Sequence, residues 1–322
     1  THRLSSAASD VYKRQKHTSF NIQAEHYQIV GHHLIETLRE LASEAFTKEV
    51  EEAWTAAYLF LAKVFIDREG ELYLQRKQAI GGWENARQFV VKQKQPESEY
   101  VTSFVLEPQD GGDVLDYNPG QYVGVEVKPS AGEHNEIRQY SLSQKPNGKN
   151  YRISVKREVG EHNGLVSNFM HDEVNEGDTV HLYAPAGDFY YQEKDAPVVL
   201  ISAGVGATPI QSMLQTLAAA DKKDVSYLYA CNSADQHTFK SETEQLISQR
   251  GWQQFTWYLN DQAHFEGQMN LSLVERELPL SSADFYLCGP VAFMEAVVKQ
   301  LEGLGVTRDR IHYEVFGPHT YL

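Results

Sequence analysis

The stretch Ile201-Ser202-Ala203-Gly204-Val205-Gly206-Ala207-Thr208-Pro209 decides the fold of the C-terminal part of the chain. An apolar strand runs into a glycine turn, and Pro209 stands where a helix would begin. Glycines let the backbone approach a pyrophosphate, and a helix N-terminus presents free N–H groups to it. The third glycine of the common dinucleotide fingerprint is replaced by Pro209, so the turn alone also fits a tight strand-to-helix connection without a ligand.

Strands and helices alternate around this stretch, over residues 196–322. The pattern predicts helices from Pro209, near Ser241–Gln249 and over Val291–Leu304, and strands over Val198–Ser202, Val225–Ala230, Phe255–Leu259, Asp284–Cys288 and Ile311–Val315. Such alternation is typical of an α/β domain with a parallel sheet, where ligands bind beyond the carboxyl ends of the strands. At one such end stand Cys288, Gly289 and Pro290, which we expect to face the ligand, although a small buried cysteine would explain the first of them equally well.

Residues 83–192 have a different pattern, with short strands between turns. We expect strands over Ser103–Leu106, Gln121–Val127, Tyr151–Lys156 and Thr179–Tyr183, with turn signals such as Pro119-Gly120 and Asn147-Gly148 between them. This pattern predicts a small antiparallel β-barrel.

One tetrapeptide in this segment, Arg138-Gln139-Tyr140-Ser141, is expected at the start of a barrel strand. It offers a cation, an aromatic surface and a hydroxyl, which a flavin dinucleotide with its dianionic pyrophosphate and flat ring system requires. Four residues match by chance often, and an exposed strand with an unrelated arginine is the plain alternative.

The N-terminal segment is helical in pattern. Apolar residues recur at spacings of three and four over Ala24–Ala42 and Thr47–Tyr73, with Thr47 as a plausible N-cap, and Gly81-Gly82 ends the helical region. Residues 16–80 are therefore expected to form an all-α unit. Residues 1–15 show little apolar periodicity, and we interpret them as a foreign or disordered lead sequence.

Composition narrows the functional classes. The formal net charge of −15 argues against a nucleic-acid partner, because a phosphate backbone requires a basic face. Two cysteines, Cys231 and Cys288, rule out a disulfide framework and favour a reducing cytoplasm. No apolar run approaches the roughly 20 residues of a membrane span, and no signal peptide is visible.

The order of the motifs is more specific than any one of them. Arg138-Gln139-Tyr140-Ser141, then Gly204 to Pro209, then Cys288-Gly289-Pro290, then Glu314-Val315-Phe316-Gly317 resembles the ferredoxin–NADP reductase superfamily. The resemblance implies a barrel that holds FAD and an α/β domain that binds NADH or NADPH. On the FAD side it implies Tyr122, Arg138, Gln139, Tyr140, Ser141, Lys156, Gly164, Val166, Ser167, Val315, Phe316, Gly317 and Pro318. On the NAD(P)H side it implies Gly204, Val205, Gly206, Ala207, Thr208, Pro209, Cys288, Gly289 and Pro290.

The upstream segment sharpens the resemblance. Lys16-His17-Thr18-Ser19-Phe20, Glu25-His26-Tyr27, and the helix end Phe65-Ile66-Asp67-Arg68-Glu69 look like the proximal side of a flavohaemoglobin globin domain. By this resemblance His17 is the proximal ligand of the iron of haem b, while Tyr27 and Glu69 hydrogen-bond behind it and push electron density toward the metal. Lys16 and Glu314 match positions that tune redox behaviour at the haem–flavin junction. A single histidine among 13 would carry little weight without the family.

The resemblance implies a cytoplasmic, monomeric nitric oxide dioxygenase. Electrons pass from NAD(P)H through FAD to haem, and nitric oxide and oxygen become nitrate, which detoxifies nitric oxide. A complete globin has about eight helices, and we expect this chain to hold only the C-terminal part, without the distal tyrosine and glutamine. Two alternatives stay open, a stand-alone NAD(P)H–flavin reductase and an oxygen or nitric oxide carrier or sensor without turnover. No arginine closely follows Asn232-Ser233-Ala234-Asp235, where an adenosine ribose should lie, so the sequence favours NADH.

Overall fold

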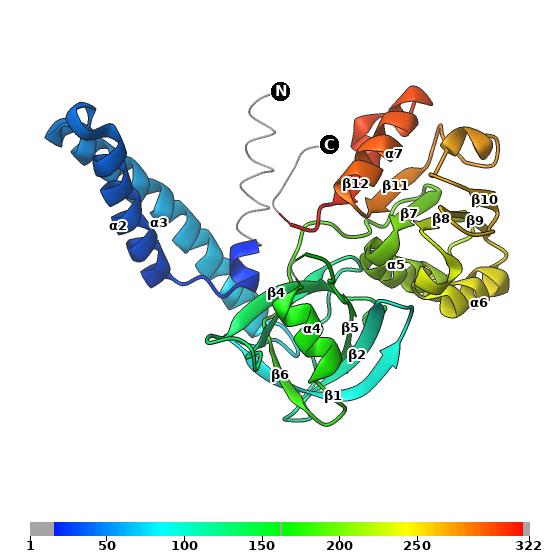
Figure 1. Cartoon of the computed structure of the whole chain (residues 1–322), viewed down its shortest axis with the longest axis horizontal. Helices are drawn as coiled ribbons and strands as arrows, with labels where there is room; N and C mark the ends of the chain where they lie inside the picture. The colour runs from blue at the N-terminus through cyan, green and yellow to red at the C-terminus, as the bar shows by residue number, and fades with distance from the viewer. Residues whose placement is uncertain (1–15, 162, 318–322) are drawn as a thin grey trace.

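The computed structural model describes residues 16–161 and 163–317, and these form three parts (Figure 1). A helical hairpin of α2 (Ala24–Ala42) and α3 (Lys48–Gln78) is joined by the short η1 (Ser43–Ala45) and stands clear of the C-terminal domain. Thr47 caps α3 by accepting from the N–H of Val50, as expected. The helix runs to Gln78, beyond the predicted end at Tyr73, because no breaker precedes Gly81-Gly82.

The middle part is an antiparallel sheet in the order β4-β3-β6-β1-β2-β5. A bridge between Leu142 and Ile153 joins its two edges, which closes the barrel. The interior is a buried apolar cluster that includes Phe89, Phe104 and Tyr151. The elements are β1 (Arg87–Pro96), β2 (Val101–Pro108), β3 (Tyr122–Val127), β4 (Glu136–Ser141), β5 (Tyr151–Lys156), α4 (Leu165–Asp172) and β6 (Thr179–Leu182).

One local expectation in the barrel was wrong. The tetrapeptide Arg138–Ser141 ends β4 rather than starting it, because pairing with β3 already begins at Glu136. Of the residues expected on the FAD side, Gly164 is the N-cap of α4, and Val166 and Ser167 lie in its first turn.

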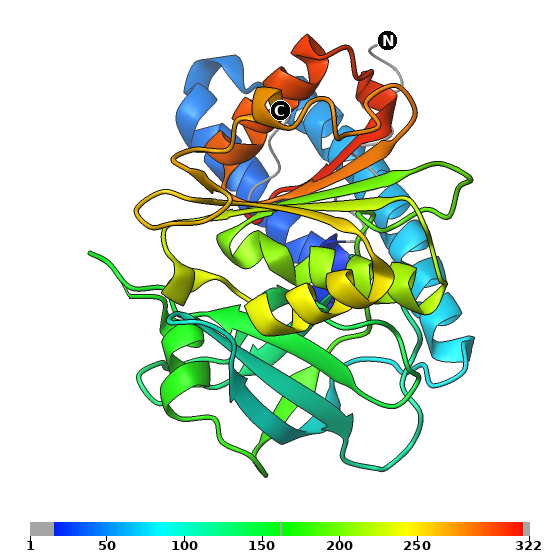
Figure 2. The ribbon, with the colours of Figure 1, turned by 90° about the vertical axis from the view of Figure 1, so that its right-hand side faces the viewer.

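The third part is a parallel sheet, as the alternation of strands and helices predicts. Its strand order is β10-β9-β8-β7-β11-β12. Separate apolar clusters cover its two faces, one around α5 and α6 and one around α7, and Figure 2 shows the sheet between these layers. The elements are β7 (Val198–Ala203), η2 (Gly204–Gly206), α5 (Ala207–Ala219), β8 (Val225–Cys231), η3 (Ala234–Gln236), α6 (Lys240–Arg250), β9 (Gln253–Tyr258), β10 (Phe265–Glu266), η4 (Leu271–Leu273), β11 (Asp284–Cys288), α7 (Val291–Gly303), η5 (Arg308–Arg310) and β12 (Ile311–Glu314).

Within the described residues, no helix has the length and apolar character that a membrane crossing requires. The predicted lead sequence, residues 1–15, and Pro318 lie outside the described residues, so their predictions are not tested by the structure.

Candidate functional site

His17 lies where the hairpin meets the barrel. One nitrogen of its ring, Nδ1, makes both of its polar contacts. Nδ1 is 2.9 Å from the hydroxyl oxygen of Tyr27 and 2.9 Å from Oε1 of Glu69. Tyr27 also donates its hydroxyl proton to Oε1 of Glu69 over 2.6 Å. Glu69 is 2% exposed, a costly position for a carboxylate unless such donors satisfy it. With a carboxylate accepting at Nδ1, the proton sits there and Nε2 keeps its lone pair, which is the arrangement of a metal-ligating histidine.

The two helices approach closely enough to hold this triad. A β-carbon on Gly31 of α2 would lie 2.4 Å from the ring of Tyr58 on α3, and the Tyr58 hydroxyl donates to the carbonyl of Tyr27 over 2.5 Å. Burial raises the pKa of Tyr27 far above its usual value, and the hydrogen bond to Glu69 adds to the shift. The phenol therefore remains a proton donor at any physiological pH.

Lys16, the neighbour of His17, reaches the C-terminal end of the chain. Its Nζ donates to the carbonyl of Gly317 over 2.6 Å. Burial raises the pKa of Glu314 to about 7, while the charge of Lys16 acts in the opposite direction and Asp188 adds to the rise. Burial also lowers the pKa of Lys16, although Glu314 counters this. The two residues thus influence each other's charge in a poorly solvated region where the N-terminal segment meets the C-terminal segment.

The same segment packs on the barrel. A β-carbon on Gly124 of β3 would lie 2.1 Å from the carbonyl oxygen of Ser19, so this contact admits only glycine. The amide of Gln139 on β4 donates to the hydroxyl of Ser19 over 2.5 Å. Gln139 therefore links the barrel to the His17 segment.

The other residues of the Arg138–Ser141 motif are spread over both faces of β4. Arg138 is exposed and donates to Glu136 over 2.9 Å, whereas Ser141 is buried and pairs in register with Tyr122 on β3. Burial raises the pKa of Tyr140 well above its usual value, so its hydroxyl stays neutral. Tyr122 packs on Gly187, where a β-carbon would lie 2.8 Å from its ring.

The start of α4 forms a small polar corner. The hydroxyl of Ser167 donates to the carbonyl of Gly164 over 3.3 Å and accepts from the N–H of Glu158 over 3.2 Å. Lys156 donates to Oε1 of Glu158 over 3.0 Å. Val166 is buried in the barrel core, so only its backbone faces this corner. The first N–H groups of a helix have no partner within it, which leaves this corner open to an anion.

The glycine turn brings β7 and α5 against β11. A β-carbon on Gly206 would lie 2.2 Å from the carbonyl oxygen of Cys288, and Gly204 has a φ of +53°. Thr208 stabilises the turn by donating its hydroxyl to the carbonyl of Val205 over 2.9 Å. Ala207 and Pro209 are buried and anchor the helix start. The chain thus needs glycine here for close approach, whether or not a ligand is bound.

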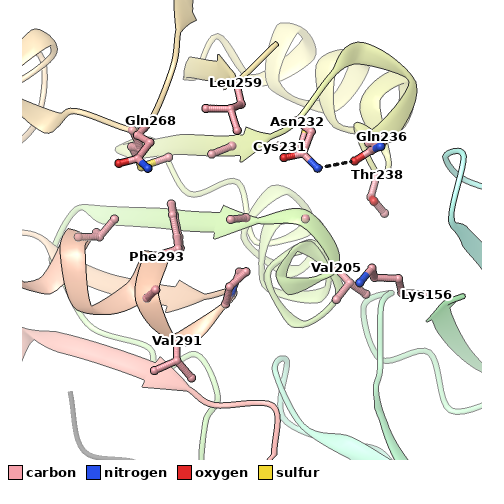
Figure 3. A pocket seen from close by; sticks show the side chains of 18 of the residues that line it. Lys156, Val205, Cys231, Asn232, Gln236, Thr238, Leu259, Gln268, Val291 and Phe293 are labelled. Atoms are coloured by element: carbon pink, nitrogen blue, oxygen red, sulfur yellow. Dashed lines mark hydrogen bonds between the residues drawn. The ribbon is translucent and has the colours of Figure 1, made fainter. Parts of the chain in front are cut away.

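A pocket of about 600 Å³ opens at this turn, between the barrel and the carboxyl ends of the parallel strands. Figure 3 shows Val291 and Phe293 of α7 on one side, Val205 beside Lys156, Cys231 and Asn232 at the end of β8, and Gln236 of η3 beside Asn232. Gly204, Gly289, Pro290, Lys156 and Phe316 also line it. Its size lies within the range of cofactor pockets.

One predicted residue in this region, Cys288, does not reach the pocket surface. Cys288 is fully buried, and its neighbours Gly289 and Pro290 provide the pocket surface at that strand end. Burial raises the pKa of its thiol well above the usual value, so it is no thiolate. Val315 is buried, whereas Phe316 is 45% exposed and faces the pocket.

Several pocket residues carry no local sequence signal. Ser98 and Tyr100 come from the loop between β1 and β2 of the barrel, and Gln236 and Thr238 come from the loop after β8. The two loops touch, because Gln236 donates to Glu99 over 3.0 Å. Only the packing of one domain on the other brings them together.

Comparisons with known proteins agree with this division. The globin family matches residues 11–65, the oxidoreductase FAD-binding domain family matches residues 88–191, and the oxidoreductase NAD-binding domain family matches residues 200–299. The middle part is therefore an FAD-binding domain and the C-terminal part an NAD-binding domain.

Similar proteins span nearly the whole chain. A flavohaemoprotein of Vibrio cholerae serotype O1 is 66% identical over 309 residues, which is 95% of this chain and 78% of that protein. The solved FAD/NAD-binding domain of a nitric oxide dioxygenase from Vibrio cholerae O1 is 60% identical, covers 73% of this chain and all of that one, and has a TM-score of 0.71. A flavohaemoglobin of Malassezia yamatoensis with bound FAD and haem is 25% identical, with 97% and 80% coverage and a TM-score of 0.84. With its His17 triad, its barrel and its glycine-turn pocket in this order, the chain belongs to the flavohaemoprotein family.

Proposed function

We propose that this chain is a nitric oxide dioxygenase. As a flavohaemoprotein it is an NAD(P)H-dependent oxidoreductase. The finer proposal is that electrons pass through FAD to haem b, so that nitric oxide and oxygen are converted to nitrate and nitric oxide is detoxified. One of the similar solved proteins is a nitric oxide dioxygenase, which supports this activity.

The observation that carries the proposal is the placement of residues 16–19. Within four residues, this segment supplies the histidine of the triad, the Lys16 contact to Gly317, and the Ser19 contacts to β3 and β4. A histidine held in this way beside a flavin-type barrel would place a bound haem close to the flavin that is to reduce it. A plain flavin reductase would have no use for the arrangement.

The donors around His17 fit a haem. The ring is oriented through Nδ1 by a carboxylate and a phenol, and Nε2 is left as the ligand. The hairpin also exposes large apolar side chains, including Trp54 at 49% and Phe60 at 73%. Exposed apolar surface of this kind marks a binding face, and a porphyrin is a ligand of matching chemistry.

The barrel and its helix fit FAD. We propose that Tyr122, Tyr140 and Ser141 contact the flavin, that Arg138 moves from Glu136 to a phosphate, and that Gln139 links the site to Ser19. The N–H groups that begin with Gly164 at the start of α4, together with Lys156 and Ser167, would hold the pyrophosphate. Val315, Phe316, Gly317 and Pro318 would close over the ring.

The pocket at the glycine turn fits a nicotinamide dinucleotide. We propose that Gly204, Val205 and Gly206, with the helix start at Ala207, Thr208 and Pro209, hold the pyrophosphate, and that Gly289 and Pro290 lie at the nicotinamide, backed by buried Cys288. Among the described residues that line the pocket, Lys156 is the one cation, and it pairs with Glu158. A 2′-phosphate would find little to neutralise it, which supports NADH as the donor.

When bound, FAD and haem would supply the redox chemistry, which divides a two-electron donation into single electrons and activates oxygen. The protein contributes binding and electrostatics. Glu69 and Tyr27 fix the ring of His17 and increase the electron density on it, Lys16 and Glu314 set the charge at the junction, and Phe316 shields the flavin side of the pocket from water.

The second candidate function is a stand-alone NAD(P)H–flavin reductase. The specific observation in its favour is the exposure of the hairpin, where Leu59, Phe60 and Leu61 are all more than half exposed. If the described part of the globin retains haem poorly, electrons would leave the flavin for another acceptor.

We further propose that the chain is a monomer and that it works in a reducing cytoplasm. The free thiols of Cys231 and Cys288 favour that compartment.

The absorption spectrum of the purified chain, expressed with haem supplied, tests the proposal. We expect flavin bands and a Soret band, with the Soret band lost in His17→Ala and kept in His33→Ala, an exposed histidine of α2. Nitrate should then form from nitric oxide at the expense of NADH. Flavin bands with NADH oxidation and no Soret band would favour the reductase instead.

A further inference from the structure

A buried guanidinium outside the cofactor sites joins the barrel to the NAD-binding domain. Arg152 on β5 has 13% of its side chain exposed. It donates from Nε to the hydroxyl of Ser143 over 3.2 Å and from Nη2 to the carbonyl of Ser143. Its Nη1 crosses to the other domain and donates to Oε2 of Glu242 on α6 over 3.0 Å. The Arg152 side chain thus makes two hydrogen bonds within the barrel and a third to the NAD-binding domain.

Phe239 adds a strained element to this contact. Its ring centroid lies 5.0 Å from the guanidinium carbon of Arg152, and the residue is 2% exposed. Phe239 has a φ of +61°, a left-handed conformation that a bulky residue rarely adopts. Strain of this kind costs on the order of 1–3 kcal/mol and clusters where geometry matters to function. Phe239 is the N-cap of α6, so this left-handed residue lies where the helix begins, against the barrel.

The contact extends to α5, the helix that starts at the glycine turn. The amide of Gln215 donates to Oε1 of Glu242, and its oxygen accepts from the N–H of Lys145 on the barrel over 2.8 Å. The hydroxyl of Ser212 donates to the carbonyl of Gln144 over 2.7 Å. Helix α5 therefore hydrogen-bonds to residues 144–145 of the barrel, next to Ser143, and Glu242 of α6 joins this network through Arg152 and Gln215.

The strand that carries Arg152 also reaches the pocket. Lys156, four residues further along β5, lines the pocket where the two domains meet. At about 3.3 Å per residue, the two side chains start roughly 13 Å apart on one rigid strand. A change in the angle between the domains at Arg152 would therefore shift one wall of the pocket relative to the other.

We propose that Arg152 is a positioning residue, which with Phe239 and Glu242 forms an interdomain clamp that sets the approach of the nicotinamide to the flavin. The proposal rests on the proposed function, in which a hydride with its electron pair moves from C4 of the reduced nicotinamide to oxidised FAD. Such a transfer needs reacting atoms about 3–3.5 Å apart, and a misplacement of about 1 Å can cost about 100-fold in rate.

Anaerobic stopped-flow reduction of the FAD-loaded chain by NADH tests the clamp. In Arg152→Ala we expect the limiting rate at saturating NADH to fall about 10- to 100-fold, with the Kd for NADH changed by less than about threefold. The isotope effect with NADH deuterated at C4 should be at least as large as in the unsubstituted chain. Arg152→Lys should recover part of the rate, because it keeps the charge and loses the fork.

The matched control is Arg157→Ala. Arg157 pairs with Asp172 over 2.5 Å at the surface of the barrel domain, away from the interdomain contact, and this substitution should leave the limiting rate unchanged. If Arg152→Ala does not fold, Glu242→Gln tests the same contact from the exposed side, with a smaller expected loss of about threefold.

Hydrogen–deuterium exchange of the flavin-free chain gives a readout other than activity. Arg152→Ala should speed exchange at the amides of Lys145 and Thr243, and Arg157→Ala should not. A limiting rate within twofold of the unsubstituted chain, a loss confined to Kd, or unchanged exchange at both amides would overturn the clamp. If the unsubstituted chain itself transfers no hydride from NADH to FAD, the proposed function fails, and the exchange result then decides whether the two domains are clamped.

Discussion

The ring of His17 receives both of its polar contacts at Nδ1, and this has an electronic consequence. Glu69 accepts from the ring and from Tyr27 and is itself 2% exposed, while the His17 side chain is 37% exposed. A hydrogen bond to a buried charged group is stronger than one at the surface. With a haem bound, the carboxylate would give the imidazole partial anionic character, and this would stabilise ferric iron more than ferrous iron.

Replacing Glu69 with Gln tests this effect. We expect haem to be retained and its reduction potential to rise by about 60 mV, the one-electron equivalent of about 1.4 kcal/mol. Spectroelectrochemical titration measures the shift. Glu71→Gln, an exposed position that pairs with Arg68 on the same helix, is the control and should not change the potential. Equal potentials in the two variants would count against an electronic role for Glu69.

Glu314 is the second residue whose environment sets its chemistry. Burial raises its pKa from the usual 4.5 to about 7, with Lys16 and Asp188 as the charged groups that face it. An acid whose pKa is higher in the folded state favours folding below its unfolded value. This contribution is lost as pH rises from about 4.5 to about 7, because the unfolded chain has already released the proton that the fold retains.

We therefore expect Glu314→Gln to become more stable relative to the unsubstituted chain as pH rises from 5 to 7.5. The shift of about 2.5 pKa units sets an upper bound of about 3 kcal/mol on the difference. Urea unfolding at both pH values, followed by tryptophan fluorescence, measures it. Glu295→Gln on the exposed side of α7 should show the same pH dependence as the unsubstituted chain. If Glu314→Gln does so too, the carboxyl is ionised in the fold at pH 5.

Single residues differ in how far the sequence predicts them. The triad of His17, Tyr27 and Glu69 was predicted through a resemblance, and the structure brings the three together within hydrogen-bonding distance. The sequence left the burial of Cys288 open as an alternative and did not indicate that Val166 points inward, because both depend on which face of an element meets the core. Arg152 gave no signal at all, since its partners are 90 residues or nine residues away along the chain.

Among the elements, the turn between β7 and α5 depends strictly on one residue type. A β-carbon on Gly206 would meet the carbonyl oxygen of Cys288 at 2.2 Å and the N–H nitrogen of Gly289 at 2.6 Å. Both are backbone atoms of a neighbouring strand end, so neither can move cheaply. The sequence predicted this turn correctly because glycine and proline mark it directly.

Gly206→Ala should therefore destabilise the NAD-binding domain by about 1–3 kcal/mol and weaken NADH binding. Gly303→Ala, at the end of α7 with open space around it, should be neutral or stabilising by up to about 1 kcal/mol. Thermal unfolding and NADH titration of both variants give the comparison. A Gly206→Ala variant that binds NADH normally would mean that the strand ends are not as tightly packed as described.

Other elements were predicted less well, for identifiable reasons. β1 (Arg87–Pro96) was not predicted, because polar residues such as Lys92 and Gln95 interrupt its apolar pattern. Its register with β2 shifts between Val91 and Gln93, which breaks the period of two that marks a strand. Helix α3 continues five residues past Tyr73, although its last turns are mostly exposed and carry no apolar face that marks them in the sequence.

For the chain as a whole, the three parts differ in how much they bury. The barrel and the parallel sheet have extensive cores, whereas α3 buries only Ala62, Phe65 and Glu69 among its described residues, and α2 buries Gly31. Composition and motif order predicted the three parts and their sequence along the chain. They could not predict the interdomain clamp, nor the pocket surface that the β1–β2 loop forms with the segment after β8. Both features depend on how the folded domains pack against each other.

The low burial of the hairpin leads to a prediction about its dynamics. A segment with few buried contacts opens locally at a small free-energy cost, and a ligand that binds only the closed form suppresses the opening. We expect amides of α2 and the first half of α3 to exchange hydrogen rapidly in the haem-free chain and at least about tenfold more slowly once haem binds, while β7 and β11 exchange equally slowly in both. Hydrogen–deuterium exchange with mass spectrometry, with His17→Ala plus haem as the control, measures this. A hairpin protected as strongly as β7 without haem would show that its two helices are stable alone, and haem retention would then depend on His17 coordination rather than on the folding of the site.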